Sequence, residues 1–130
     1  MGKVVHFEIP TDDIVRASEF YRSIFGWDLR DMSEFGMDYT IAMTVPVDEQ
    51  TQIPTEAGAI NGGMMKRSDQ TPSPVITIEV EEITAALADI EAKGGSTVQP
   101  RTRIEGMGAF AYFKDPEGNV MGLWETTPRT

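Results

Sequence analysis

The sequence predicts an α+β fold built from two similar halves, and three observations lead to this prediction. The first is an internal repeat, because residues 4–21 align with residues 73–90 when the chain is shifted by 69 positions. The second is that each copy begins with apolar residues at alternate positions, which is typical of a strand with one buried face. The third is that each copy then changes to apolar spacings of three and four, which are typical of an amphipathic helix.

The first half is expected to contain one helix and several strands. The elements are a strand at residues 3–9, a helix at 14–25, strands at 38–45 and 59–65, and a polar loop at 46–57 between these two strands. Asp12 or Asp13 is placed to cap the helix, and Gly26 is placed to end it. Gly62 and Gly63 fall inside a strand, which indicates a bend or a close approach of backbone or ligand.

The second half repeats this plan. Its elements are a strand at residues 75–80, a helix at about 83–93, and strands at 96–99, 108–114 and 119–125. Gly94 and Gly95 are placed to stop the helix, and residues 115–119 have the composition of a tight turn. We therefore expect a single domain over residues 1–130, in which a linker at 67–74 joins two β-α-β-β-β modules, about 3–66 and about 75–126.

Strand periodicity assigns side chains to two faces of the expected sheet. The apolar face, which we expect to meet the helices, carries Val5, Phe7, Ile9, Ile76, Ile78 and Val80. The opposite face carries His6, Glu8, Thr77 and Glu79. With one helix per half, the helices are expected to cover only the first of these faces.

Composition excludes several classes of function. The net charge of −10 argues against nucleic acid as a partner, because phosphate binding needs clustered basic residues. No apolar run is long enough to cross a membrane, and the N-terminal residues do not resemble a signal peptide. The chain has no cysteine, which excludes disulfides and thiolate chemistry. We therefore expect a cytoplasmic protein with no membrane partner.

Two residues are candidates for chemistry. His6 is the only histidine, and the repeat places Val75 at the equivalent position of the second half. Histidine serves as a metal ligand or a general base because its ordinary pKa lies near neutrality, although a lone histidine is also often structural. Glu125 ends the last strand, where a glutamate is also often simply solvated.

The chain resembles the vicinal oxygen chelate superfamily, which includes glyoxalase I, bleomycin resistance proteins and extradiol dioxygenases. The resemblance rests on the tandem halves, on residues 6–29 (HFEIPTDDIVRASEFYRSIFGWDL), and on a terminal pattern formed by Phe113, Asp115, Pro116, Glu117, Gly118, Asn119, Leu123 and Glu125. It implies a curved mixed sheet around a cup, with the helices on the outer face. It also implies that metal-dependent members hold a divalent ion through the first and last strands of each module.

Only two of the four metal positions implied by the resemblance carry a ligand in this sequence. His6 and Glu125 match two of them, whereas Val75 and a position at or next to Met65 match the others. Catalytic metal sites usually have about three protein ligands, so no cofactor is expected. The cup is expected to bind a small molecule through Glu8, Met64, Met65, Thr77, Glu79, Met121 and Leu123.

Three functions remain open on these residues. The first is a small-molecule-binding protein whose metal site is depleted. The second is a metal-dependent lyase, isomerase or dioxygenase that uses His6 and Glu125. The third is a metal-independent enzyme in which His6 or Glu125 acts as acid or base. The resemblance also implies a homodimer, since open sheets leave strand edges to be covered.

Overall fold

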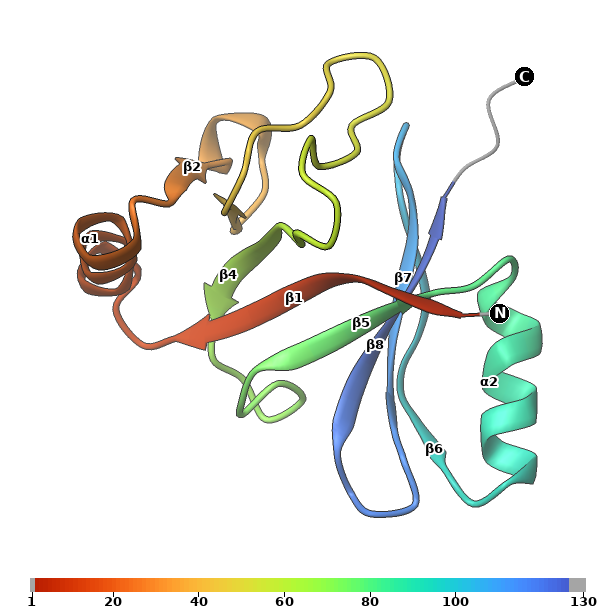
Figure 1. Ribbon diagram of the computed structural model, residues 1–130. Coiled ribbons are helices and arrows are strands. Elements are labelled where there is room, and N and C mark those ends of the chain that lie inside the picture. The colour runs from red at the N-terminus through yellow and green to blue at the C-terminus, as the bar shows by residue number, and fades with distance from the viewer. Residues whose placement is uncertain (1, 127–130) are drawn as a thin grey trace. The chain divides into compact units, whose positions relative to one another are not determined.

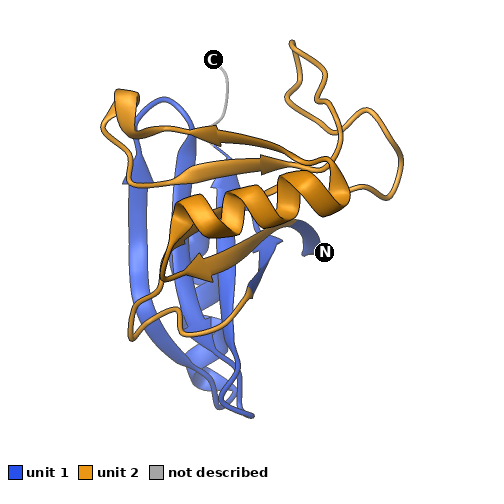
Figure 2. Cartoon of the chain, turned by 90° about the vertical axis from the view of Figure 1, so that its left-hand side faces the viewer, with its two compact units in different colours: residues 1–5, 75–130 blue, residues 6–74 orange. Residues whose placement is uncertain are grey.

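The computed structural model describes residues 2–126, which form two α-helices, one short 3-10 helix and eight β-strands (Figure 1). The α+β class expected from the repeat is therefore confirmed. The chain divides into two compact units (Figure 2). Unit 1 contains the residues up to Val5 and those from Val75 onward, and unit 2 contains His6–Pro74. No helix within residues 2–126 is long and apolar enough to cross a membrane.

Unit 2 holds one helix beside a four-stranded arrangement. Its elements are β1 (Lys3–Thr11, whose first residues belong to unit 1), α1 (Ile14–Phe25), β2 (Asp28–Asp31), η1 (Ser33–Phe35), β3 (Thr40–Met43) and β4 (Gly62–Lys66). The strand order is β2-β3-β4-β1, in which β1 and β4 are parallel and the other neighbours are antiparallel. The sequence did not place β2, whose four residues are too short to show a period.

Helix α1 has the ends that the sequence predicts. The Asp13 side chain accepts a hydrogen bond from the backbone N–H of Arg16 at 3.0 Å, and Gly26 ends the helix with a φ of 71°. Beyond Gly26, the Trp27 ring stacks on Tyr21 with centroids 4.8 Å apart. No residue of α1 is itself buried, so its apolar side chains are only partly covered.

Unit 1 holds the second helix and the larger core. Its elements are β5 (Val75–Glu79), α2 (Ile83–Ala92), β6 (Ser96–Ile104), β7 (Gly108–Lys114) and β8 (Val120–Thr126). The strand order is β5-β8-β7-β6, and β5 and β8 are parallel. The core packs α2 against the strands through Ile83, Leu87, Ala109, Ala111, Phe113 and Leu123.

Strand β6 extends beyond the expected residues 96–99, as far as Ile104. Its pairing with β7 shifts register on either side of Gln99, and Pro100 follows directly. Proline is tolerated in edge strands and at bulges, and β6 is the last strand in the order of unit 1. Pro100 therefore marks an irregularity within β6 and not its end.

The turn expected at residues 115–119 joins β7 to β8. The Asp115 Oδ1 atom accepts hydrogen bonds from the backbone N–H groups of Glu117 and Asn119, both at 2.9 Å. Gly118 has a φ of 84°, a left-handed conformation that glycine adopts without strain. This turn therefore lies directly before the start of β8.

Candidate functional site

The two faces of the unit 2 strands carry different side chains. Ile9 lines one cavity together with Ala17 and Phe20 of α1, so Ile9 points toward the helix. His6 and Glu8 alternate with Ile9 along β1 and therefore point to the opposite face. We call this opposite face, with His6, Glu8, Tyr39, Gly63 and Met65, the His6 face.

Tyr39 completes a polar cluster on the His6 face. Its hydroxyl oxygen lies 2.8 Å from Nε2 of His6, and either atom can donate in this hydrogen bond, depending on the histidine tautomer. The Tyr39 ring occupies the space above Gly63, because a Cβ atom added to Gly63 would overlap the tyrosine hydroxyl. Gly63 therefore lets the phenol reach His6.

Burial disfavours the charged form of the histidine at this site. Burial lowers the pKa of His6 below its ordinary value of 6.5, and the neighbouring charge of Glu8 opposes this effect. Glu8 is itself only 8 % exposed and is paired in register with Gly63. The site thus combines a neutral imidazole, a phenol and a buried carboxylate, a set that can form hydrogen bonds or move a proton.

The register shows which residues of the two halves are equivalent. Glu8 is paired with Gly63 in the β1–β4 ladder, and Thr77 is paired with Gly122 in the β5–β8 ladder. Thr77 follows Glu8 by 69 positions, so Gly63 and Gly122 occupy equivalent places in the repeat. This register aligns Glu125 with Lys66, the residue next to Met65. Glu125 is three residues beyond Gly122 and therefore points to the other face of its strand.

Met64 and Met65 point to opposite faces of β4. Met64 is fully buried and is paired with Ile9, so it faces α1 and not the His6 face. Met65 is half-buried and lies on the His6 face. Of these two expected ligand contacts, only Met65 is placed beside the polar cluster.

In unit 1 the face away from α2 carries Thr77 and Glu79. Thr77 is 5 % exposed, and its hydroxyl oxygen would lie 2.7 Å from a Cβ atom at Gly122. Glu79 forms an ion pair with Lys3 at 3.8 Å. These two expected residues therefore share one face, and each already has close neighbours within unit 1.

Glu125 points to the opposite face of unit 1, toward α2. Its Oε1 atom accepts a hydrogen bond from the backbone N–H of Ile83 at 2.8 Å, which caps the first turn of α2. Its Oε2 atom lies 2.7 Å from the Arg101 guanidinium. The hydrogen bond from Arg101, followed by the one from Ile83, lowers the pKa of Glu125 below its ordinary value.

The expectation that Glu125 lies on the open face is therefore corrected. The same correction applies to Met121 and Leu123, which alternate with Val120, Gly122 and Trp124 and pack in the α2 core. Tyr39 is the site residue that the sequence did not identify, because an aromatic residue near a strand is usually core. The indication in the sequence was Gly63 within a strand. A glycine there suggests that another group lies close to the backbone, but it does not say which residue that is.

The donor set does not fit the divalent metal that the resemblance implied. The last-strand positions paired with Glu8 and Thr77 are Gly63 and Gly122, and glycine offers no side-chain donor. Within residues 2–126, no three His, Cys, Asp or Glu side chains gather as a metal-binding group. The His6 nitrogen Nε2 is already engaged by Tyr39. The residues at these positions therefore do not fit a divalent metal.

The chain is similar in sequence to known proteins. The CFP32 protein of Mycobacterium tuberculosis is 26% identical over 120 residues, which cover 91% of this chain and 43% of that protein. The anthracycline biosynthesis protein DnrV of Streptomyces peucetius is 25% identical over 131 residues, which cover 95% of this chain and 46% of DnrV. The chain thus spans less than half the length of these two relatives.

Solved structures show the same fold. A variant of Streptomyces coelicolor methylmalonyl-CoA epimerase, in complex with 2-nitronate-propionyl-CoA, has a TM-score of 0.61 at 19% identity and covers 97% of this chain and 98% of its own. The hypothetical protein BH1468 of Bacillus halodurans has a TM-score of 0.63 at 15% identity, with 99% and 97% covered. The family model matches residues 3–123. The chain belongs to the Glyoxalase/Bleomycin resistance protein/Dioxygenase superfamily.

Proposed function

We propose that this chain is a small-molecule-binding member of the superfamily and that the His6 face of unit 2 is its binding surface. The observation that carries the proposal is the polar cluster of His6, Glu8 and Tyr39, with its 2.8 Å hydrogen bond over Gly63. Glu8 is buried, and His6 and Tyr39 are partly buried. Polar groups removed from water are costly unless they are hydrogen-bonded, so three of them on one sheet face are typical of a site that orients a ligand.

The chemistry of this face favours an organic ligand that has a polar group beside an apolar body. Tyr39 and His6 offer a phenol oxygen and an imidazole nitrogen, while the flexible thioether of Met65 adapts to apolar surfaces. The names of similar proteins agree with this class, since DnrV is named for anthracycline biosynthesis and the epimerase structure holds a propionyl-CoA derivative.

A second candidate is metal-independent proton transfer with His6 as the general base. It is favoured by the lowered pKa of His6, because an imidazole that is neutral at pH 7 is ready to accept a proton. Glu125 is not part of this proposal, since its carboxylate caps α2.

A library of neutral and charged organic fragments, screened by thermal shift on protein treated with EDTA, tests the proposal. Mass action predicts that a fragment bound at this face raises the melting temperature. Tyr39→Phe and His6→Gln should each weaken the selected fragment by roughly 1–3 kcal/mol, the cost of losing a hydrogen-bond partner in a buried site.

Tyr21→Phe is the matched control, because it removes a phenol hydroxyl elsewhere in unit 2 and should leave fragment affinity unchanged. Fragments that need added Zn²⁺ or Mn²⁺ in order to bind would contradict a metal-free site. Turnover of a carbon acid that is lost in His6→Gln, but retained in Tyr21→Phe, would favour the proton-transfer enzyme.

A further inference from the structure

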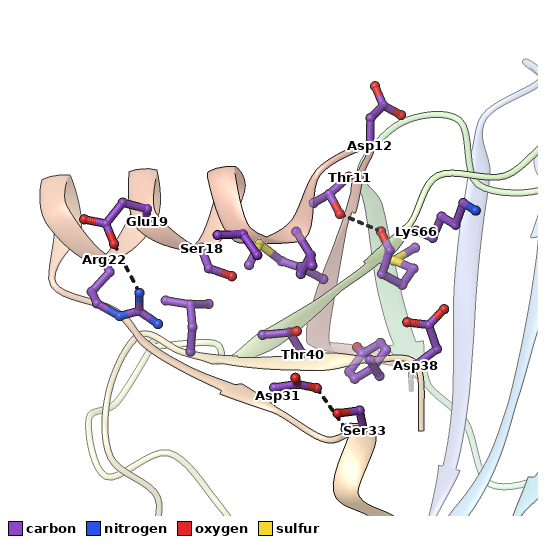
Figure 3. A pocket seen from close by; sticks show the side chains of 16 residues that line it. Thr11, Asp12, Ser18, Glu19, Arg22, Asp31, Ser33, Asp38, Thr40 and Lys66 are labelled. Atoms are coloured by element: carbon purple, nitrogen blue, oxygen red, sulfur yellow. Dashed lines mark hydrogen bonds and ion pairs between the residues drawn. The ribbon is translucent and has the colours of Figure 1, made fainter. Parts of the chain in front are cut away.

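We propose that unit 2 contains a second binding site, on the α1 side of its strands, for a hydrophobic organic cation such as an alkylammonium ion. The site is a cavity of about 550 Å³ between α1 and strands β2, β3 and β4 (Figure 3). This volume lies in the range of roughly 300–1,000 Å³ that small-molecule pockets occupy. The cavity opens on the face of the strands opposite the His6 face. Of the residues that define the His6 face, Tyr39 and Met65 also border this cavity.

The wall of the cavity is apolar where α1 meets the strands. Ile14 and Val15 come from the first turn of α1, and Leu29 and Met64 come from β2 and β4. Val15 is 76% exposed, and no residue of α1 is buried. A ligand with an apolar body would remove this surface from water, which is a favourable transfer.

The hydroxyl of Thr40 opens into the cavity. Thr40 is only 6% exposed and lines the cavity beside Met64, with which it is paired in the β3–β4 ladder. Among residues 2–126, no hydrogen bond involves the Thr40 side chain, whereas the equally buried Thr11 hydroxyl donates to the Met65 carbonyl at 3.3 Å. Because no buried side-chain oxygen among the described residues lacks a partner, the Thr40 oxygen is accessible from the cavity and can accept a hydrogen bond from the N–H group of a ligand.

The charges around the cavity favour a cation. Two of its carboxylates are already paired, since Asp12 contacts Arg67 at 3.0 Å and Glu19 contacts Arg22 at 3.5 Å. Asp31 accepts a hydrogen bond from a backbone N–H at 2.8 Å.

Within the described chain, neither Asp31 nor Asp38 has a cationic side chain within 4.0 Å. Both lie on the strand side of the cavity in Figure 3, near Thr40. In the same view the Lys66 side chain extends away from Thr40 and Asp31. A single positive charge near Thr40 therefore meets two carboxylates that lack a counterion.

Three probes of similar length test the charge preference: 4-phenylbutylamine as the cation, 4-phenylbutan-1-ol as the neutral analogue, and 4-phenylbutanoate as the anion. Calorimetry at low salt should show the amine binding more tightly than the alcohol, and the alcohol more tightly than the anion. Low salt is needed because counterions screen exposed charges.

Variants assign the binding to the cavity. Thr40→Val keeps the side-chain shape and should weaken the amine about two- to tenfold, the effect of one hydrogen bond. Asp31→Asn together with Asp38→Asn should reduce amine affinity to that of the alcohol. Asp69→Asn is the matched control for one charge, because Asp69 lies in the linker outside the cavity, and it should leave binding unchanged.

Ser18→Phe places a ring into the cavity from the exposed helix and should abolish binding of both the amine and the alcohol. Circular dichroism confirms that each variant is folded. His6→Gln should not affect any probe, so this test is independent of the function proposed for the His6 face. The proposal is overturned if no probe binds at millimolar concentration, if all three bind equally, or if the amine binds Ser18→Phe as tightly as the unaltered protein.

Discussion

Removing the Glu125 carboxylate should destabilise unit 1, because this side chain caps α2. The residue that precedes α2, Glu82, makes no side-chain hydrogen bond to the first turn. Glu125 supplies the missing acceptor from β8, with its Oε1 atom 2.8 Å from the Ile83 N–H. Glu125 also places a negative charge at the N-terminus of the helix, where it is favourable.

The expected magnitude follows from these two contacts. Losing a helix cap costs about 1 kcal/mol, and losing a charge at a helix terminus costs about 0.3–1 kcal/mol. Glu125→Ala removes both and should lower the free energy of unfolding by roughly 1–2 kcal/mol. Glu125→Gln keeps an oxygen acceptor and loses only the charge, so its effect should be smaller. Arg101→Gln leaves the cap in place and serves as a control.

Urea denaturation followed by fluorine NMR gives a reading for each unit. The two tryptophans lie in different units, Trp27 in unit 2 and Trp124 in unit 1, so 5-fluorotryptophan labels both. The Trp124 signal should report the loss of stability in Glu125→Ala. An unchanged denaturation midpoint for that signal, or an effect no larger than that of Arg101→Gln, would refute the capping argument.

Three further predictions concern the site and the assembly. In an NMR pH series, the pKa of the His6 imidazole should lie below its ordinary value of 6.5. The stability that His6 contributes should be present above pH 6.5 and should be lost as the pH falls through the lowered pKa of the folded state. His6→Gln should remove this pH dependence. Gly63→Val should displace the Tyr39 ring and change the His6 Nε2 chemical shift, and an unchanged shift would contradict the packing described here. Light scattering should give twice the chain mass of 14.4 kDa if the protein is a homodimer, and a mass that stays at 14.4 kDa on tenfold concentration would contradict this.

The sequence predicted the elements whose signals are local. The helix cap expected at Asp12 or Asp13, the Gly26 helix end and the turn at residues 115–119 each depend on a few neighbouring residues. The structure confirms the helix end and the turn, and it places the cap at Asp13. Strand periodicity also predicted that Phe7 and Ile78 would face the helices. The Phe7 ring lies 5.6 Å from Trp27 beside α1, and Ile78 packs against the α2 core.

The elements that the sequence missed depend on pairing between distant segments. The face of each β8 residue is set by its register with β5, which pairs Thr77 with Gly122. Local patterns do not give this register, and Glu125, Met121 and Leu123 were therefore expected on the wrong face. Tyr39 was missed for a similar reason, because its partner His6 is 33 positions away and no local pattern joins them.

The central claim is that the His6 face binds an organic ligand without a metal. His6 is the only histidine, so a long-range ¹H–¹⁵N spectrum of labelled protein contains a single imidazole system. In the presence of EDTA, the fragment selected by thermal shift should move both ring nitrogen signals, and Tyr39→Phe should weaken this response. Ring signals that do not respond to the selected fragment in EDTA, or that respond only after a divalent metal is added, would contradict the claim.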